Sequence, residues 1–177
     1  MAEPLFNRLC LVGVGLIGSS IARVAKKRGD IAKTLVVTTR RAETLERVRE
    51  LGLADVVEAD AARAVEGCDG VIFCIPVGAY ADAMRHIAPH LAPGAVLTDV
   101  GSTKGSVVRD LAPLMPEGVH LIPAHPMAGT EHSGPDAGFP ELFEGRYCIV
   151  TPLPDSDPAA ALAAGREISR VGAATAE

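Results

Sequence analysis

The chain has 177 residues, of which 48% are hydrophobic and 3% aromatic, and its formal net charge is −5. This length fits one domain with its own hydrophobic core, and the acidic balance argues against binding to nucleic acid or to an anionic membrane surface. No apolar run approaches the roughly 20 residues of a membrane span. The N-terminal sequence also lacks the basic start and apolar stretch of a signal peptide, so we expect a cytoplasmic protein.

The four cysteines are Cys10, Cys68, Cys74 and Cys148. They form no C-x-x-C pair, and no histidine lies near them at the spacing of metal ligands. Three of them lie within apolar runs. This pattern predicts buried, reduced thiols, as is usual in a cytosolic protein.

Residues 9–20 predict a buried strand, a glycine turn and the start of a helix. The apolar run at 9–12 is typical of a strand that is covered on both faces. The turn fits the pattern G-x-G-x-x-G, whose glycines allow a tight turn, the approach of a pyrophosphate and close packing of the helix. The helix that follows directs free N–H groups toward the phosphates. We therefore predict a dinucleotide site at Gly13, Gly15, Leu16, Ile17 and Gly18.

Strand and helix patterns alternate along the rest of the chain. Strands are predicted at residues 34–38, 55–58, 70–75, 95–100, 119–122 and 147–151, and helices at 41–51, 60–65, 77–91, 102–114 and 158–170. The glycine- and proline-rich stretch 129–145 predicts a long functional loop. This alternation predicts one α/β domain over residues 1–177, a Rossmann-like, doubly wound, mostly parallel sheet with helices on both faces. Ligands of such sheets bind at the carboxyl ends of the strands.

The residues after the second and fourth predicted strands are candidates for cofactor contacts. Thr39, Arg40 and Arg41 follow 34–38, where a cofactor without a 2′-phosphate usually meets an acidic residue. Hydroxyl and guanidinium groups suit a 2′-phosphate, so NADP is favoured over NAD, although both arginines would also fit a solvated helix start. Ile75 and Pro76 form an apolar shelf that either lines the cofactor or only begins a helix.

Two polar side chains follow the predicted strand at 95–100. Ser102 is a candidate N-cap for the next helix, and its hydroxyl would lie near the nicotinamide end of a cofactor that crosses the sheet. Lys104 could be either a cation for the substrate or a surface charge. We favour the surface.

The stretch 123–134 is the most distinctive in the chain. His125 directly follows a predicted buried strand and lies next to Pro126, so its backbone is expected to be extended. Thr130, Glu131 and His132 follow in a glycine-rich loop. A histidine at this edge suits proton transfer, because its unperturbed pKa is about 6.5. The spacing of these residues matches no zinc motif, and we predict no metal site.

Three motifs together resemble the prephenate/arogenate (cyclohexadienyl) dehydrogenase family. They are GVGLIGS at residues 13–19, DVGSTK at 99–104 and HPMAGTEHSG at 125–134. The resemblance implies an oxidoreductase of tyrosine biosynthesis with hydride transfer to NAD(P)⁺. Its substrate would be prephenate, giving 4-hydroxyphenylpyruvate, or arogenate, giving tyrosine, with loss of carbon dioxide.

The resemblance also implies roles for single residues. His125 would accept the proton of the ring hydroxyl, and Ser102 would bond both that histidine and the cofactor. Thr130 and Glu131 would lie near the substrate, and His132 is a nearby cation for its carboxylates. Family members continue into a C-terminal helical domain that forms a homodimer and carries an arginine for the ring carboxylate. We therefore expect these 177 residues to bind cofactor and to turn substrate over poorly.

Two other readings of the sequence remain. The chain could be a catalytically silent NAD(P)-binding module, such as a redox sensor, or another Rossmann reductase, such as an imine reductase. A sensor has no need for the His125 segment. The substrates that reduce the cofactor would separate the two kinds of enzyme.

Overall fold

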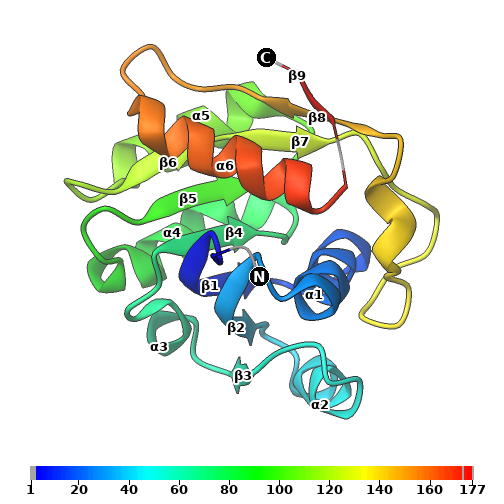
Figure 1. Ribbon diagram of the computed structural model, residues 1–177. Coiled ribbons are helices and arrows are strands. Elements are labelled where there is room, and N and C mark those ends of the chain that lie inside the picture. Colours follow the sequence, from blue (N-terminus) through cyan, green and yellow to red (C-terminus); the bar gives the residue numbers. More distant parts are fainter. Residues whose placement is uncertain (1–2, 173, 177) are drawn as a thin grey trace.

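The computed structural model describes residues 3–172 and 174–176, in which six parallel strands form the main sheet in the order β3-β2-β1-β4-β5-β6 (Figure 1). These strands are β1 (Phe6–Val12), β2 (Ala32–Thr38), β3 (Val56–Glu58), β4 (Gly70–Phe73), β5 (Val96–Asp99) and β6 (His120–Ile122). Val12 pairs with Thr38 on one side and Phe73 on the other, and Phe73 pairs with Asp99. This register aligns the carboxyl ends of the four central strands along one edge of the sheet.

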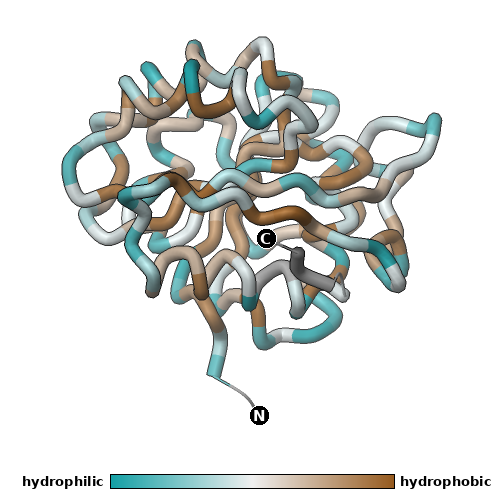
Figure 2. The backbone as a smooth tube through the Cα atoms, turned by 90° about the horizontal axis from the view of Figure 1, so that it is seen from above, coloured by the Kyte–Doolittle hydropathy of each residue, from teal (hydrophilic) through white to brown (hydrophobic). Residues whose placement is uncertain are grey.

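Helices cover both faces of this sheet. They are α1 (Leu16–Arg28), α2 (Ala42–Glu50), α3 (Ala61–Val65), α4 (Tyr80–Ile87), α5 (Lys104–Leu111) and α6 (Pro158–Arg170). Because successive strand residues point to opposite faces, Leu9 and Leu11 join a core with α1 and α6, whereas Cys10 and Val12 join a second core with α3, α4 and α5. The central strand residues are almost all buried, and Figure 2 shows how hydrophobic and hydrophilic stretches alternate along the chain. The prediction of a doubly wound sheet is confirmed.

A second, three-stranded sheet lies beside the first. It consists of β7 (Ala124–Pro126), β8 (Tyr147–Val150) and β9 (Ala174–Ala176), with β7 antiparallel and β9 parallel to β8. Helix α6 packs against β5, β6 and β8 and so joins the two sheets. The extended backbone predicted at His125 is confirmed, but the pairing of its segment with residues 147–150 has no signal in the sequence.

Two predicted helices differ from those of the structure. The helix predicted at 77–91 is divided into a 3-10 turn η1 (Val77–Ala79), helix α4 and a second turn η2 (Ala88–His90). The helix predicted at 102–114 ends in the turn η3 (Ala112–Leu114) and begins only at Lys104. Pro89 and Pro113 explain the late changes, because proline lacks the N–H that an α-helix interior needs. The N-cap is Thr103, so the prediction that Ser102 caps this helix is wrong.

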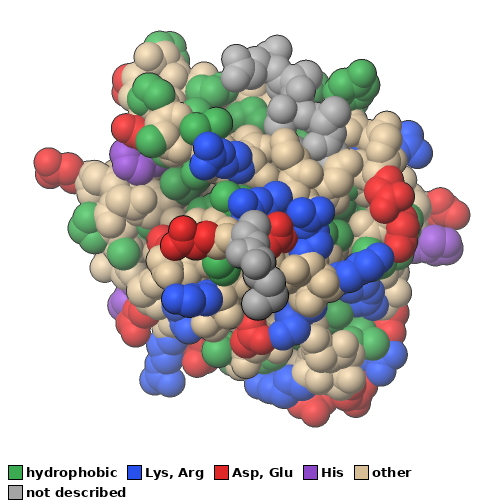
Figure 3. All heavy atoms as spheres, viewed as in Figure 1, with side chains coloured by type: hydrophobic (Ala, Val, Ile, Leu, Met, Phe, Trp, Pro, Cys, Tyr) green, Lys and Arg blue, Asp and Glu red, His purple; other side chains and the backbone are tan. Residues whose placement is uncertain are grey.

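The surface and three of the four cysteines agree with the composition. On the face shown in Figure 3, Lys and Arg side chains are interspersed with Asp and Glu. The sequence predicts four buried thiols. Cys10, Cys68 and Cys148 are buried, whereas Cys74 is only half-buried, so the prediction is wrong for Cys74. Within the described residues, no helix is both long enough and apolar enough to cross a bilayer.

Candidate functional site

The turn between β1 and α1 closes only with glycine at two of its positions. Gly13 has a φ of +99°, and a Cβ there would come within 2.6 Å of Ile75 Cγ2. A Cβ at Gly18 would lie 2.5 Å from the Gly13 carbonyl oxygen. Since real Cβ atoms do not approach other heavy atoms so closely, these contacts fix the distance between the first turn of the helix and the end of the strand.

Gly15 is the N-cap of α1, and no side chain caps this end of the helix. A Cβ at Gly15 would meet nothing within 4 Å, so the approach to the helix start is open. The first turn has no acidic residue, and its N–H groups and dipole suit an anion such as a pyrophosphate. The side chains of Leu16 and Ile17 pack into or against the core, which leaves their backbone groups for a ligand.

A pocket of about 690 Å³ adjoins this turn at the carboxyl edge of the sheet. This volume lies within the usual range for ligand sites. Its lining includes most of the residues predicted for the cofactor, namely Gly13, Thr39, Arg40, Arg41, Ile75 and Pro76. It also includes residues that the sequence analysis missed, namely Ala59, Asp60, Ala61, Ala79, Asp82, Ala83 and His86.

Asp60 and His86 are the polar pair among the missed residues. Asp60 caps α3 by accepting a hydrogen bond from the Ala62 N–H at 3.0 Å, and its Oδ1 lies 3.1 Å from His86 Nε2. The contact with His86 and the bond from Ala62 lower the pKa of Asp60. Asp60 follows β3 as Arg40 follows β2, so a search after every predicted strand would have found it. His86 carries no such signal, because it reaches the pocket from within α4.

His125 lies in β7 at the other end of the carboxyl edge and is half-buried. Burial lowers its pKa below the usual 6.5, the positive charge of Lys104 lowers it further, and Asp99 opposes both effects. The imidazole is therefore neutral near pH 7 and can accept a proton.

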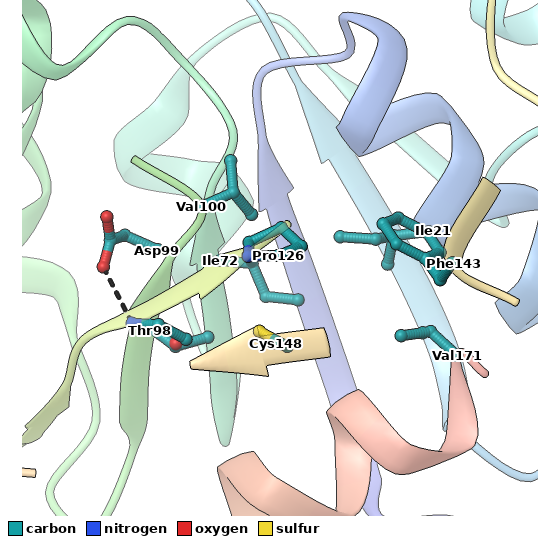
Figure 4. Close-up of a pocket in the computed structure, with 10 residues that line it drawn as sticks. Ile21, Ile72, Thr98, Asp99, Val100, Pro126, Phe143, Cys148 and Val171 are labelled. Atoms are coloured by element: carbon teal, nitrogen blue, oxygen red, sulfur yellow. Dashed lines mark hydrogen bonds between the residues drawn. The ribbon is translucent and has the colours of Figure 1, made fainter. Parts of the chain in front are cut away.

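The structure brings the segments of Ser102 and His125 together at Asp99. The Gly101 N–H donates to Asp99 Oδ2 at 2.8 Å, and the Ala124 N–H donates to Oδ1 at 3.1 Å (the dashed line in Figure 4). Each donor immediately precedes one of the two predicted catalytic residues. The Ser102 side chain itself is exposed.

Lys104 is not a surface charge, so that prediction is wrong. Its side chain is only 17% exposed, and its Nζ lies 2.6 Å from both Asp99 carboxylate oxygens and 2.5 Å from the Ala124 carbonyl oxygen. Burial lowers the pKa of Lys104, and Asp99 opposes that effect. The physical reason for its position is that the Asp99 side chain is fully buried and needs a counter-charge.

The three predicted substrate residues lie on an exposed loop. The His132 N–H donates to Thr130 Oγ1 at 3.2 Å, and His132 Nε2 lies 3.5 Å from Glu131 Oε1. These interactions join the three residues to one another rather than to β7. Their role toward a substrate stays a prediction. In the part of the chain that the structure describes, no cluster of three or more His, Cys, Asp or Glu residues could hold a metal ion.

A small cavity separates the end of β5 from the second sheet. Thr98, Asp99 and Val100 line one side, and Ile21 and Phe143 close the other (Figure 4). Its volume of about 20 Å³ is close to what one water molecule needs. A cavity of this size is too small for a dinucleotide or a ring substrate.

The comparison with protein families decides where this chain belongs. Residues 21–176 match the family described as prephenate dehydrogenase, nucleotide-binding domain. The chain belongs to the prephenate dehydrogenase family. The resemblance of the three motifs is thereby confirmed, and the nucleotide-binding role of the domain agrees with the glycine turn and the pocket beside it.

Individual relatives carry the names expected of this family. The chain is 39% identical over 149 residues to a cyclohexadienyl dehydrogenase of Zymomonas mobilis, a match that covers 84% of this chain and 50% of that protein. It is 33% identical to a prephenate dehydrogenase of Lactococcus lactis, of which it covers 41%. The chain thus spans half or less of the length of these curated relatives.

Solved structures show the same fold. The prephenate dehydrogenase of Aquifex aeolicus, in complex with hydroxyphenyl propionate and NAD⁺, superimposes with a TM-score of 0.87 at 26% identity, covering 96% of this chain and 59% of that one. An arogenate dehydrogenase of Synechocystis gives a TM-score of 0.87 at 27% identity, over 96% of this chain and 58% of that one.

Proposed function

We propose that this chain is the cofactor-binding part of an NAD(P)-dependent dehydrogenase of tyrosine biosynthesis. The reaction is the oxidative decarboxylation of prephenate, of arogenate or of both. Membership of the family supports this proposal, and the observation that carries it is a half-buried histidine with a lowered pKa at the carboxyl edge of a nucleotide-binding sheet. The activity is proposed for a full-length protein, because the match covers only 50% and 41% of these two relatives.

His125 is the base in this proposal. Bound NAD(P)⁺ supplies a hydride acceptor for the ring carbon that bears the hydroxyl. Neutral His125 takes the proton of that hydroxyl, whose oxygen becomes a carbonyl. The electrons of the carboxylate that leaves as carbon dioxide then make the ring aromatic, and His125 can return its proton to the phenolate oxygen. A histidine with a lowered pKa suits both transfers.

Four other side chains assist His125 in this proposal. Ser102 bonds the imidazole and the nicotinamide end of the cofactor, which is compatible with its exposed position after Gly101. Thr130, Glu131 and His132 contact the substrate from their loop. Their exposure leaves them accessible to a substrate that arrives from solvent.

The open helix start at Gly15 and the 690 Å³ pocket fit a dinucleotide. Gly13 and Gly18 shape the turn, Gly15 lets the pyrophosphate approach the helix start, and Ile75 and Pro76 line the apolar side. We propose a preference for NADP over NAD. Arg40 and Arg41 are exposed at the pocket, whereas the carboxylates of Asp60 and Asp82 are engaged by His86 and Arg85.

A His125→Asn variant of the full-length protein tests the activity. We expect cofactor affinity to be retained and turnover of prephenate or arogenate to fall about 100- to 10,000-fold, because the proton acceptor is lost. His90→Asn is the matched control, since His90 is exposed and contacts Glu66 on another part of the surface. Full turnover by the His125→Asn variant, or reduction of the cofactor by neither substrate, would contradict the proposal.

Titration calorimetry with NADP⁺ and NAD⁺ tests the cofactor preference. We expect wild type to bind NADP⁺ more tightly, and Arg40→Ala to weaken NADP⁺ binding about tenfold while NAD⁺ binding stays unchanged. Arg49→Ala is the control, because Arg49 lies on α2 and pairs with Glu46 at 3.1 Å. Tighter binding of NAD⁺ would exclude the proposed role of the arginines and leave the site itself in place.

Two further features rest on the family resemblance. We propose that the full-length protein is a homodimer formed by a C-terminal helical domain, and that it is cytoplasmic. Sedimentation of the full-length protein at micromolar concentration tests the first, and a monomer would contradict it.

A further inference from the structure

The two oxygens of the Asp99 carboxylate bind two peptide groups that are far apart in the sequence. Oδ2 accepts the Gly101 N–H at 2.8 Å, and Oδ1 accepts the Ala124 N–H at 3.1 Å, across 25 residues of chain. One donor precedes Ser102 and the other precedes His125. A single buried side chain therefore fixes the relative place of the two predicted catalytic residues.

Lys104 completes this arrangement. Its Nζ contacts both carboxylate oxygens and the Ala124 carbonyl oxygen, so the ion pair binds both backbone groups of the residue before His125. A Cβ at Gly101 would lie 2.5 Å from Val77 Cγ2 and 3.0 Å from Asp99 Oδ2, so the Ser102 loop folds tightly over the carboxylate. The buried Tyr80 hydroxyl donates to Asp99 Oδ2 at 3.2 Å and covers its remaining side.

We propose that Asp99 and Lys104 are positioning residues for the reaction proposed above: their ion pair holds the peptide groups before Ser102 and His125 in place and sets the charge that His125 faces. The proposal rests on the proposed function for its catalytic meaning. Its geometry is independent of the substrate, because all of these contacts lie within the chain.

The charges around His125 come from two elements of the main fold. Lys104 of α5 lowers the pKa of His125 and Asp99 of β5 raises it, with the effect of Lys104 the larger. Two further groups interact with this pair. Burial and Asp99 raise the pKa of Tyr80 of α4, and Cys148 of β8 raises the pKa of Lys104. Tyr80 is neutral at physiological pH, so the sign of the field at His125 depends on the Asp99–Lys104 pair.

The experiment is an NMR titration of the histidines in the 177-residue chain. The chain has five histidines, and the resonance that disappears in His125→Asn identifies His125. We expect Lys104→Met to raise the His125 pKa by about 1 pH unit, because the variant removes a positive charge and leaves Asp99 unbalanced. Lys104→Arg keeps the charge and should leave the pKa near the wild-type value. Lys27→Met is the matched control, since Lys27 is exposed on α1.

A second variant covers the case in which Lys104→Met does not fold. The double variant Asp99→Asn/Lys104→Met lacks both charges of the ion pair. Because Lys104 lowers the pKa of His125 and Asp99 raises it, we expect a His125 pKa between those of wild type and Lys104→Met. Hydrogen exchange of the Gly101 and Ala124 amides should accelerate together in this variant, while the Gly94 amide, which donates to Gly118, stays protected. An unchanged His125 pKa in a folded Lys104→Met variant, or unchanged exchange of both amides in the double variant, overturns the proposal.

These measurements need no turnover, so they separate this proposal from the proposed function. In the full-length enzyme, the acid limb of kcat/KM should move to higher pH in Lys104→Met by the same amount as the His125 pKa. An NMR shift without activity toward prephenate or arogenate would keep the positioning role and reject the substrates.

Discussion

The pocket beside the glycine turn and the edge at His125 are built in different ways. The pocket is lined by the turns that follow β1 to β4 and by one side of α4, and the glycine turn beside it closes only without side chains at Gly13 and Gly18. The His125 edge depends on one buried ion pair that joins segments 25 residues apart. The glycine turn and the residues directly after the strands are thus encoded locally, whereas the half of the site that transfers a proton depends on the tertiary fold.

The largest effect should follow from breaking the ion pair. Asp99→Asn leaves Lys104 buried without its counter-charge, and we expect the free energy of unfolding to fall by about 3–5 kcal/mol. Urea denaturation of the 177-residue chain measures this. Asp110→Asn is the control, because Asp110 lies in a pair with the exposed Arg109. Equal midpoints for the two variants would show that the His125 edge does not depend on the pair.

The glycine turn should respond differently at two of its positions. Gly18→Ala brings a Cβ to 2.5 Å from the Gly13 carbonyl oxygen, and we expect a loss of about 1–3 kcal/mol of stability from overpacking. Gly15→Ala meets nothing within 4 Å, so the same denaturation experiment should show a smaller loss, which comes only from the poorer capping by alanine at this N-cap.

The same Gly15→Ala variant should nevertheless bind the cofactor about tenfold more weakly, because the new methyl group occupies the approach of the pyrophosphate. Calorimetry measures this affinity. Undiminished binding by Gly15→Ala would mean that the phosphates lie elsewhere.

The pH dependence of the free energy of unfolding tests the His125 edge by itself. Because the pKa of folded His125 lies below its ordinary 6.5, the unfolded chain binds more protons between the two values. The contribution of His125 to stability therefore rises with pH through that window and is lost as the pH falls. The difference in unfolding free energy between wild type and His125→Asn, measured from about pH 5 to about pH 8, should increase with pH. A difference that is flat or falls with pH would contradict the lowered pKa.

The smallest effect is expected for the ion pair that joins the long loop 129–145 to α2. Arg47 Nη2 pairs with Asp136 Oδ1 at 2.6 Å, but both side chains are largely exposed. Asp136→Ala should leave the unfolding midpoint unchanged, because solvent screens such pairs. A clear destabilisation would show that the loop is held as firmly as β7.

The sequence predicts the main sheet well and the His125 edge only in part. Apolar runs next to glycine residues predict the strands near 9–12 and 70–75, because buried parallel strands are almost entirely apolar. Arg40 and Pro76 are found because they directly follow predicted strands. These predictions use only neighbours in the sequence.

Other features depend on contacts that no local pattern encodes. Lys104 resembles any lysine at a helix start until the fold buries Asp99 beside it. Ser102 resembles an N-cap, but the turn around Gly101 delays the helix to residue 104. His86 enters the pocket only because α4 packs beside the turn before α3.

The shared carboxylate at Asp99 has a consequence for protein engineering. Its two oxygens bind the amides of Gly101 and Ala124, so the anchor of the His125 segment lies in residues 99–104 and acts on the backbone alone. A chimaera that takes only residues 123–126 from another dehydrogenase should therefore keep this anchor, because every residue except proline supplies the N–H that Asp99 binds. The exchange should fail where the donor sequence has proline directly before the histidine.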